Sequence, residues 1–203
     1  MAQPDFDARA KTWDDDPVKR ERAQAVAAAI RARVKLSGDM TALEYGAGTG
    51  LLSFEFADEL GSITLADSSE GMLDVARAKI ARADLDSRVR AVNLDLTRDP
   101  LPDERYDVIY SMMTLHHVPD TAVLFEQFRA LLKPGGYVCI ADLDAEDGSF
   151  HGAGVDVHHG FDRDALAEVI RAAGFADVTM DTCFEIRRGA RSYPVFLAAA
   201  RRD

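Results

Sequence analysis

The chain has 203 residues, of which 47% are hydrophobic and 29% are charged, and this size fits one globular domain with a full α/β core. Its formal net charge of −11 argues against a bulk electrostatic grip on nucleic-acid phosphates, so we expect no nucleic-acid partner. The sequence has neither the apolar core of a signal peptide nor an apolar run near the ~20 residues of a membrane span, which predicts a cytoplasmic protein with no membrane partner.

The first 36 residues predict a helical segment ahead of the main fold. Asp16 can serve as a helix N-cap and Pro17 as the first helical residue, and an apolar stripe at helical spacing follows, formed by Ala23, Val26, Ile30 and Val34. Two roles fit this segment: packing against the edge of a sheet, or a lid over a ligand. We assign residues 1–36 to a helical lid and residues 37–203 to the core of the same single domain.

From residue 40 onward, strand-like and helix-like segments alternate, which predicts a parallel sheet covered by helices. Strands are expected at 40–45, 62–66, 89–94, 106–112 and 137–143. Helices are expected over 51–60, after a cap at Ser68 or Ser69, and across 124–132 before Lys133-Pro134-Gly135-Gly136. Cys139 lies in the last of these strands, so a buried thiol is favoured there over a nucleophile.

The alternation of strands and helices does not continue to the end of the sequence. A further helix, which Gly174 ends, is followed by strand-like runs at 178–186 and 193–200 with no room for a helix between them. Such a short connection predicts an antiparallel pair in place of another crossover.

A glycine-rich turn follows the first strand in Leu43-Glu44-Tyr45-Gly46-Ala47-Gly48-Thr49-Gly50. Glycines at 46, 48 and 50 let the backbone turn sharply and approach a ligand, because no Cβ stands in the way. The turn also directs the first amide groups of a helix toward a polar or anionic ligand. A dinucleotide-binding G-x-G-x-x-G motif would need glycine at position 51, where Leu51 stands.

Four segments between residues 40 and 143 resemble class I methyltransferases that depend on S-adenosylmethionine (SAM). They are the E-x-G-x-G-x-G turn, Asp67 after the second strand, Asn93-Leu94-Asp95-Leu96 after the third, and 106–118, which is similar to the ubiquinone-biosynthesis type (methyltransferase type 11-like). The resemblance implies a Rossmann-like three-layer α/β sandwich, whose seven-stranded, mostly parallel sheet ends in an antiparallel C-terminal hairpin. It also implies in-line methyl transfer that leaves S-adenosylhomocysteine.

The resemblance implies a SAM site along this edge of the sheet. The turn would run beside the methionine part, Asp67 and Ser68 would meet the ribose, and the ends of later strands would meet adenine and the sulfonium. Asp67 alone also fits a turn residue, Asp95 an Asx turn, and Met72 simple core packing. The full set of cofactor candidates is Trp13, Glu44, Gly46, Ala47, Gly48, Gly50, Asp67, Ser68, Met72, Asp95, Leu96, Ser111 and Met112.

His116, His117 and Asp142 are the candidate catalytic residues. A neutral imidazole near the methyl group can take a proton from the acceptor, although one histidine of such a pair also fits a role in tying the loop to neighbouring backbone. The loop 142–161 holds three more histidines with several carboxylates. None has the i, i+4 spacing of a zinc protease, so we expect an acceptor-binding loop and no metal.

The sequence as a whole predicts a SAM-dependent methyltransferase with a small-molecule acceptor, acting as a monomer or homodimer. Two alternatives stay open. One is a SAM-binding module without transferase activity. The other is a nicotinamide-dependent oxidoreductase, which Leu51 and the terminal hairpin argue against.

Overall fold

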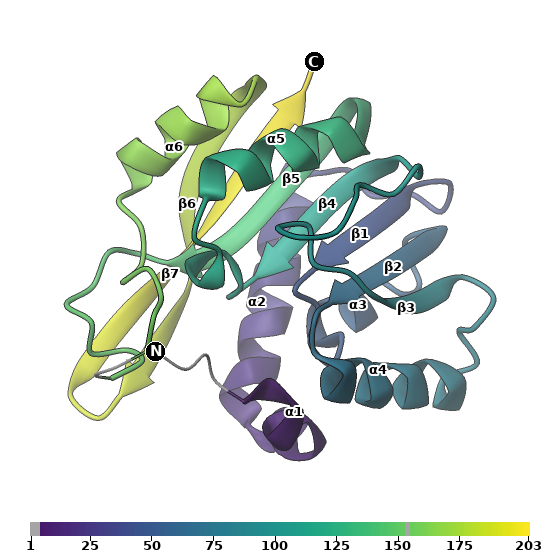
Figure 1. The fold of residues 1–203 in the computed structure, drawn as a ribbon, viewed down its shortest axis with the longest axis horizontal. Coiled ribbons are helices and arrows are strands. Elements are labelled where there is room, and N and C mark those ends of the chain that lie inside the picture. Colours follow the sequence, from purple (N-terminus) through teal and green to yellow (C-terminus); the bar gives the residue numbers. More distant parts are fainter. Residues whose placement is uncertain (1–4, 153–154) are drawn as a thin grey trace.

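The computed structural model describes residues 5–152 and 155–203, so residues 1–4 of the expected lid and 153–154 of the expected acceptor loop lie outside it. A seven-stranded sheet in the order β3-β2-β1-β4-β5-β7-β6 forms the middle layer (Figure 1). The strands are β1 (Thr41–Tyr45), β2 (Ser62–Asp67), β3 (Val89–Asn93), β4 (Tyr106–Met112), β5 (Leu132–Leu143), β6 (Phe175–Arg188) and β7 (Arg191–Arg202). The pairs among β1 to β5 are parallel, and β7 is antiparallel to both of its neighbours. The predicted Rossmann-like architecture with its C-terminal hairpin is confirmed.

The described helices are α1 (Phe6–Arg9), the short 3-10 helix η1 (Ala10–Asp15), α2 (Pro17–Arg33), α3 (Leu51–Glu55), α4 (Glu70–Arg82), η2 (Leu115–His117), α5 (Thr121–Leu131) and α6 (Arg163–Ala172). All of the described α-helices except α3 begin at a side-chain cap. Asp16 caps α2 by accepting a hydrogen bond from Val18 N at 3.0 Å, as predicted. Of the two serines proposed as caps, Ser69 caps α4, with Met72 N as its donor. None of the helices in the described ranges is long and apolar enough to cross a membrane.

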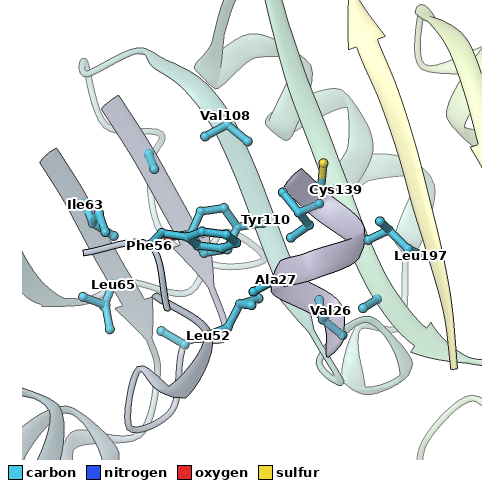
Figure 2. Close-up of a cluster of buried hydrophobic side chains, with 14 of the residues drawn as sticks. Val26, Ala27, Leu52, Phe56, Ile63, Leu65, Val108, Tyr110, Cys139 and Leu197 are labelled. Carbon is cyan, nitrogen blue, oxygen red and sulfur yellow. The ribbon is translucent and has the colours of Figure 1, made fainter. Parts of the chain in front are cut away.

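Two apolar clusters hold the helices on opposite faces of the sheet. Figure 2 shows the cluster that α2 and α3 contribute to, in which Phe56 packs edge-on against Tyr110 with ring centroids 5.2 Å apart. Along β4, Val108 and Tyr110 belong to this cluster, whereas Ile109 belongs to the cluster beneath α5 and α6. This alternation is the period of two expected of a strand covered on both faces.

Two boundaries differ by five residues from the sequence-based expectation. The helix expected over 51–60 ends at Glu55, because Phe56 N bonds Ser53 O and the chain continues in turns. The strand expected from residue 137 starts at Leu132, which pairs with Tyr106 ahead of a register shift. The prediction for Cys139 is confirmed: it lies fully inside the first cluster, and burial raises the pKa of its thiol to about 12.

Candidate functional site

A cavity of about 830 Å³ opens where the strand order reverses, at the carboxyl ends of β1, β2 and β4. Open α/β sheets place their ligands at this topological switch point. Of the predicted residues, the cavity is lined by Trp13, Glu44, Gly46, Ala47, Gly48, Asp67, Ser68, Met72, Asp95, Met112, His116 and His117. Its lining does not include Gly50, Leu96, Ser111 or Asp142.

The glycine turn takes its shape from bonds to the neighbouring strand. Gly46 N and Ala47 N both donate to Ala66 O, at 2.8 and 3.0 Å. Gly46 has φ +68° and Gly48 φ +54°, in the left-handed region that favours glycine. At Gly46, a Cβ would also lie 2.2 Å from the side chain of Thr114. The turn therefore requires glycine at position 46 for two separate reasons.

Asp67 joins the turn to the following helix. One carboxylate oxygen accepts Gly48 N at 2.6 Å, and the other accepts Ser69 N at 2.9 Å. Burial of this side chain raises its pKa, against the effect of these backbone hydrogen bonds. Each carboxylate oxygen can accept more than one hydrogen bond, so the group still has capacity for a ligand's hydroxyls. Ser68 and Met72 line the cavity beside it.

At the end of β3, Asp95 forms an Asx turn and also lines the cavity. One of its oxygens accepts Thr97 N at 2.9 Å and the Thr97 hydroxyl at 2.6 Å. Leu96 is buried. Ser111 is also buried, and its hydroxyl donates to Tyr45 O at 2.7 Å. Ser111 thus connects β4 to β1 just behind the cavity wall.

The N-terminal segment lies against the glycine turn and α4 (Figure 1). Asp7 accepts hydrogen bonds from the Ser69 hydroxyl at 2.6 Å and from Gly71 N at 2.8 Å. Lys79 Nζ contacts Asp14 at 2.7 Å. Trp13 lines the cavity with Lys19 Nζ 3.7 Å from its ring centre. While α2 packs into the core, α1 and η1 therefore lie at the cavity.

Glu44 is almost fully buried beneath the turn. Its carboxyl group accepts Ser53 N at 3.1 Å, and burial raises its pKa to about 8, although the bonds to Ser53 lower it. A carboxyl group in this setting retains its proton at pH values where an exposed glutamate has lost it.

This burial makes stability depend on pH. In the unfolded chain Glu44 ionises near pH 4.5, whereas in the ligand-free folded chain it ionises near pH 8. Between these values the folded state binds more protons, so its stability falls as pH rises, by up to about 1.4 kcal/mol per pH unit. We expect Glu44→Gln to remove this slope in urea unfolding from pH 5 to 8. Parallel curves for the two proteins would contradict this assignment.

A histidine cluster lines the other end of the cavity. His116 Nδ1 lies 2.7 Å from Asp142, whose carboxylate also accepts His116 N at 3.2 Å and Leu143 N at 2.7 Å. Burial alone would raise the pKa of Asp142, but His116 and these bonds hold it below its ordinary value. Asp142 is therefore placed behind His116, not at the cavity surface, so of the three candidate catalytic residues only His116 and His117 line the cavity.

The third histidine of the cluster comes from the loop after β5. His151 lies with its ring centroid 4.7 Å from that of His116, and His117 lies 4.2 Å from His116. Burial lowers the pKa of His117 to about 3 and that of His151 to about 4. Spacing within 142–161 could not indicate this set, because its histidines come from two segments of the chain. In that loop, His158 bonds Val118 O at 3.0 Å and fastens the loop to the backbone after η2.

Sequence reasoning missed Arg22, which lines the cavity and is 8% exposed. Within the described residues its side chain has no hydrogen bond or ion pair, and every acidic residue of the chain is among those described. Burial lowers its pKa to about 10. Arg22 lies four and eight residues before Val26 and Ile30, so the helical stripe itself placed it on the buried face.

Comparisons with known proteins agree with this geometry. A family model described as a methyltransferase domain matches residues 42–136. Among curated proteins, a ubiquinone biosynthesis O-methyltransferase from Marinobacter nauticus is 34% identical over 122 residues, which are 60% of this chain and 51% of the relative. The chain therefore spans about half the length of the curated relatives it matches.

Solved structures match over the whole fold. One is a chain from the complex between the Haloferax volcanii Trm112 methyltransferase activator and a methyltransferase, with a TM-score of 0.80, 20% identity and 99% coverage of both chains. Another is a SAM-dependent methyltransferase from Aquifex aeolicus, with a TM-score of 0.72, 21% identity, and coverage of 96% of this chain and 97% of that one. At these identities the likeness shows the fold.

Proposed function

We propose that this chain, whose residues 42–136 match a methyltransferase-domain model, is a class I SAM-dependent methyltransferase that transfers a methyl group from SAM to a small-molecule acceptor. The observation that carries this proposal is the glycine turn bonded to the Asp67 carboxylate at the edge of a cavity of about 830 Å³. The turn brings bare backbone to the cavity, and Asp67 supplies hydrogen-bond acceptors for a ribose diol.

The residues that line the cavity fit SAM part by part. The glycine turn would face the methionine part, Asp67 and Ser68 the ribose, and Met72 with Asp95 the adenine. Met112, at the carboxyl end of β4, would lie near the sulfonium. SAM supplies an activated methyl group whose departure leaves a neutral thioether, so the protein's task is to align the acceptor and exclude water.

The histidine cluster supports an acceptor site beyond the sulfonium. Asp142 engages His116 Nδ1 at 2.7 Å and leaves Nε2 as the ring nitrogen that can meet a ligand. From that position His116 can take a proton from an acceptor hydroxyl as the methyl group arrives. Asp142 would act through His116 by fixing its ring and tautomer.

The Arg22 guanidinium, which has no ion-pair partner among the described residues, supports an anionic ligand group in the same cavity, because a buried charge without a partner is costly. SAM carries a carboxylate on its methionine part. We expect Arg22→Gln to raise the Kd of SAM by about 10- to 100-fold, since a hydrogen bond to a charged group contributes about 1.5–3 kcal/mol. Isothermal titration calorimetry measures this change.

Adenosine provides the matched ligand for this experiment, because it lacks the methionine part. Its affinity should be the same for Arg22→Gln and for the parent protein. An unchanged Kd for SAM would contradict the assignment to its carboxylate. A raised KM for the acceptor in the same variant would then place the anion on the acceptor.

A methyl-transfer screen tests the proposed activity. The protein is incubated with SAM that carries a deuterated methyl group and with pools of small metabolites, and products with the corresponding mass increase are sought. Turnover that disappears in Asp67→Ala supports the proposal. Tight SAM binding without turnover would favour the alternative of a SAM-binding module. Light scattering on the same protein tests the expected monomer or homodimer.

A further inference from the structure

Three imidazole rings from two separate segments meet at the acceptor end of the cavity. His116 and His117 lie in η2, and His151 lies in the loop after β5. Each offers one ring nitrogen, and these three nitrogens all lie within 4.8 Å of one another. Histidine nitrogens gathered this closely, from positions 116, 117 and 151, form a set of ligand atoms that local sequence spacing does not reveal.

Two nitrogens of this cluster are buried without a partner. Among the described residues, His117 Nδ1 and His151 Nε2 have no hydrogen bond. Buried polar atoms in folded proteins nearly always have one, so two orphaned nitrogens in one cluster indicate a ligand that both can meet. A neutral imidazole has the free lone pair that metal coordination needs.

The third ring is oriented as in known metal centres. His116 Nδ1 engages the buried Asp142 carboxylate at 2.7 Å, which leaves Nε2 for coordination. A carboxylate on the far nitrogen of a metal-binding histidine fixes its tautomer and raises its basicity. Charged side chains of both signs surround the cluster: Asp142, Glu146 and Arg188 act on His151, and Arg22 acts on Asp142.

We propose that His116, His117 and His151 bind a divalent transition-metal ion, of which Zn²⁺ is the best fit. Imidazole nitrogens suit this class of ion, and three protein ligands with one open position are typical of catalytic zinc sites. Ligand nitrogens about 2.1 Å from a tetrahedral ion lie about 3.4 Å apart, so the rings close together from separations of up to 4.8 Å when the ion binds.

The ion's role rests on the proposed methyl transfer. An acceptor hydroxyl bound at the open position becomes more acidic and releases its proton to solvent, because His116 Nε2, once it coordinates the ion, no longer serves as the base. The resulting oxygen anion forms a bond to the methyl carbon as the carbon–sulfur bond breaks, and the sulfur keeps the bonding pair. Charge balances, because one anion and one sulfonium give two neutral products.

Metal binding is tested without SAM or acceptor. The intact protein is treated with EDTA, freed of chelator and titrated with Co²⁺ while its visible d–d absorption is followed. Zn²⁺ is then added as competitor, and bound zinc is measured by mass spectrometry after dialysis. We expect about one equivalent of metal, a loss of at least 100-fold in affinity for His117→Ala and His151→Ala, and a 10- to 100-fold loss for Asp142→Asn.

His159→Ala is the matched control, since His159 is an exposed histidine of the same loop, and it should keep full metal affinity. Circular dichroism and SAM titration of each variant show that the fold is retained. Equal metal content in His151→Ala and the parent, or no metal uptake by the parent, would overturn the proposal. SAM binding by EDTA-treated protein would still support the cofactor site, so the two proposals fail separately.

Discussion

Replacing Asp67 with alanine is expected to raise the Kd of SAM at least 100-fold. The Asp67 carboxylate holds Gly48 N at 2.6 Å and Ser69 N at 2.9 Å, and the proposed ribose contact uses its remaining acceptor capacity. The change therefore removes a ligand contact and the support of the turn together. A hydrogen bond to a charged group contributes about 1.5–3 kcal/mol, and 100-fold corresponds to about 2.7 kcal/mol. Titration calorimetry measures the effect.

Two variants control this experiment. Asp67→Asn keeps the size of the side chain but turns an NH₂ group toward one of the two backbone N–H donors, at Gly48 or at Ser69, so it should also weaken SAM binding. Asp74→Ala removes an exposed carboxylate of α4 and should bind SAM like the parent. A Kd for Asp67→Ala within threefold of the parent, in protein that remains folded, would remove Asp67 from the cofactor site.

Replacing Gly46 with alanine is expected to destabilise the fold by about 2–5 kcal/mol. The new Cβ would lie 2.2 Å from Thr114 Cγ2 and Oγ1, so β1 and the segment after β4 must move apart. Overpacking of this kind costs about 1–3 kcal/mol, and the left-handed backbone at φ +68° adds about 1–2 kcal/mol for a residue with a Cβ. Urea unfolding of the ligand-free protein measures the loss.

Gly48→Ala separates these two effects. Gly48 is also left-handed, with φ +54°, but the nearest atom to its new Cβ is Met72 Sδ at 3.9 Å. Only the backbone cost of about 1–2 kcal/mol should apply there. Equal losses for Gly46→Ala and Gly48→Ala would show that the contact with Thr114 relaxes freely.

Most of the fold could be predicted because its signals are local. The alternating strands and helices, the glycine turn and the helix-free C-terminal connection each depend on residues a few positions apart. The strand expected at 106–112 matches β4, Tyr106–Met112. The predicted ends of helices and strands were wrong where pairing with a strand distant in sequence determines them. Leu132 continues the helical apolar stripe, yet it begins β5 because Tyr106 offers it a neighbouring strand.

Site residues could be predicted only where they directly follow a strand that the sequence itself indicates. Asp67 directly follows the apolar run of β2, and the glycines directly follow β1. The histidine cluster joins His117 in η2 to His151, which lies 34 positions later in the chain. The spacing of residues within either segment does not indicate such a contact. Arg22 could not be identified from the sequence for a different reason. A charged residue on an apolar helical stripe is typical of the solvent-exposed edge of a helix, and only the structure shows that a cavity lies beside it.

Titration calorimetry of the chain with SAM, S-adenosylhomocysteine and NADH determines whether the cavity at the glycine turn binds SAM. We expect saturable binding of SAM and S-adenosylhomocysteine at one site per chain, lost in Asp67→Ala, and no heat of binding from NADH. Binding of NADH without binding of SAM would contradict the account and favour a nicotinamide-dependent oxidoreductase.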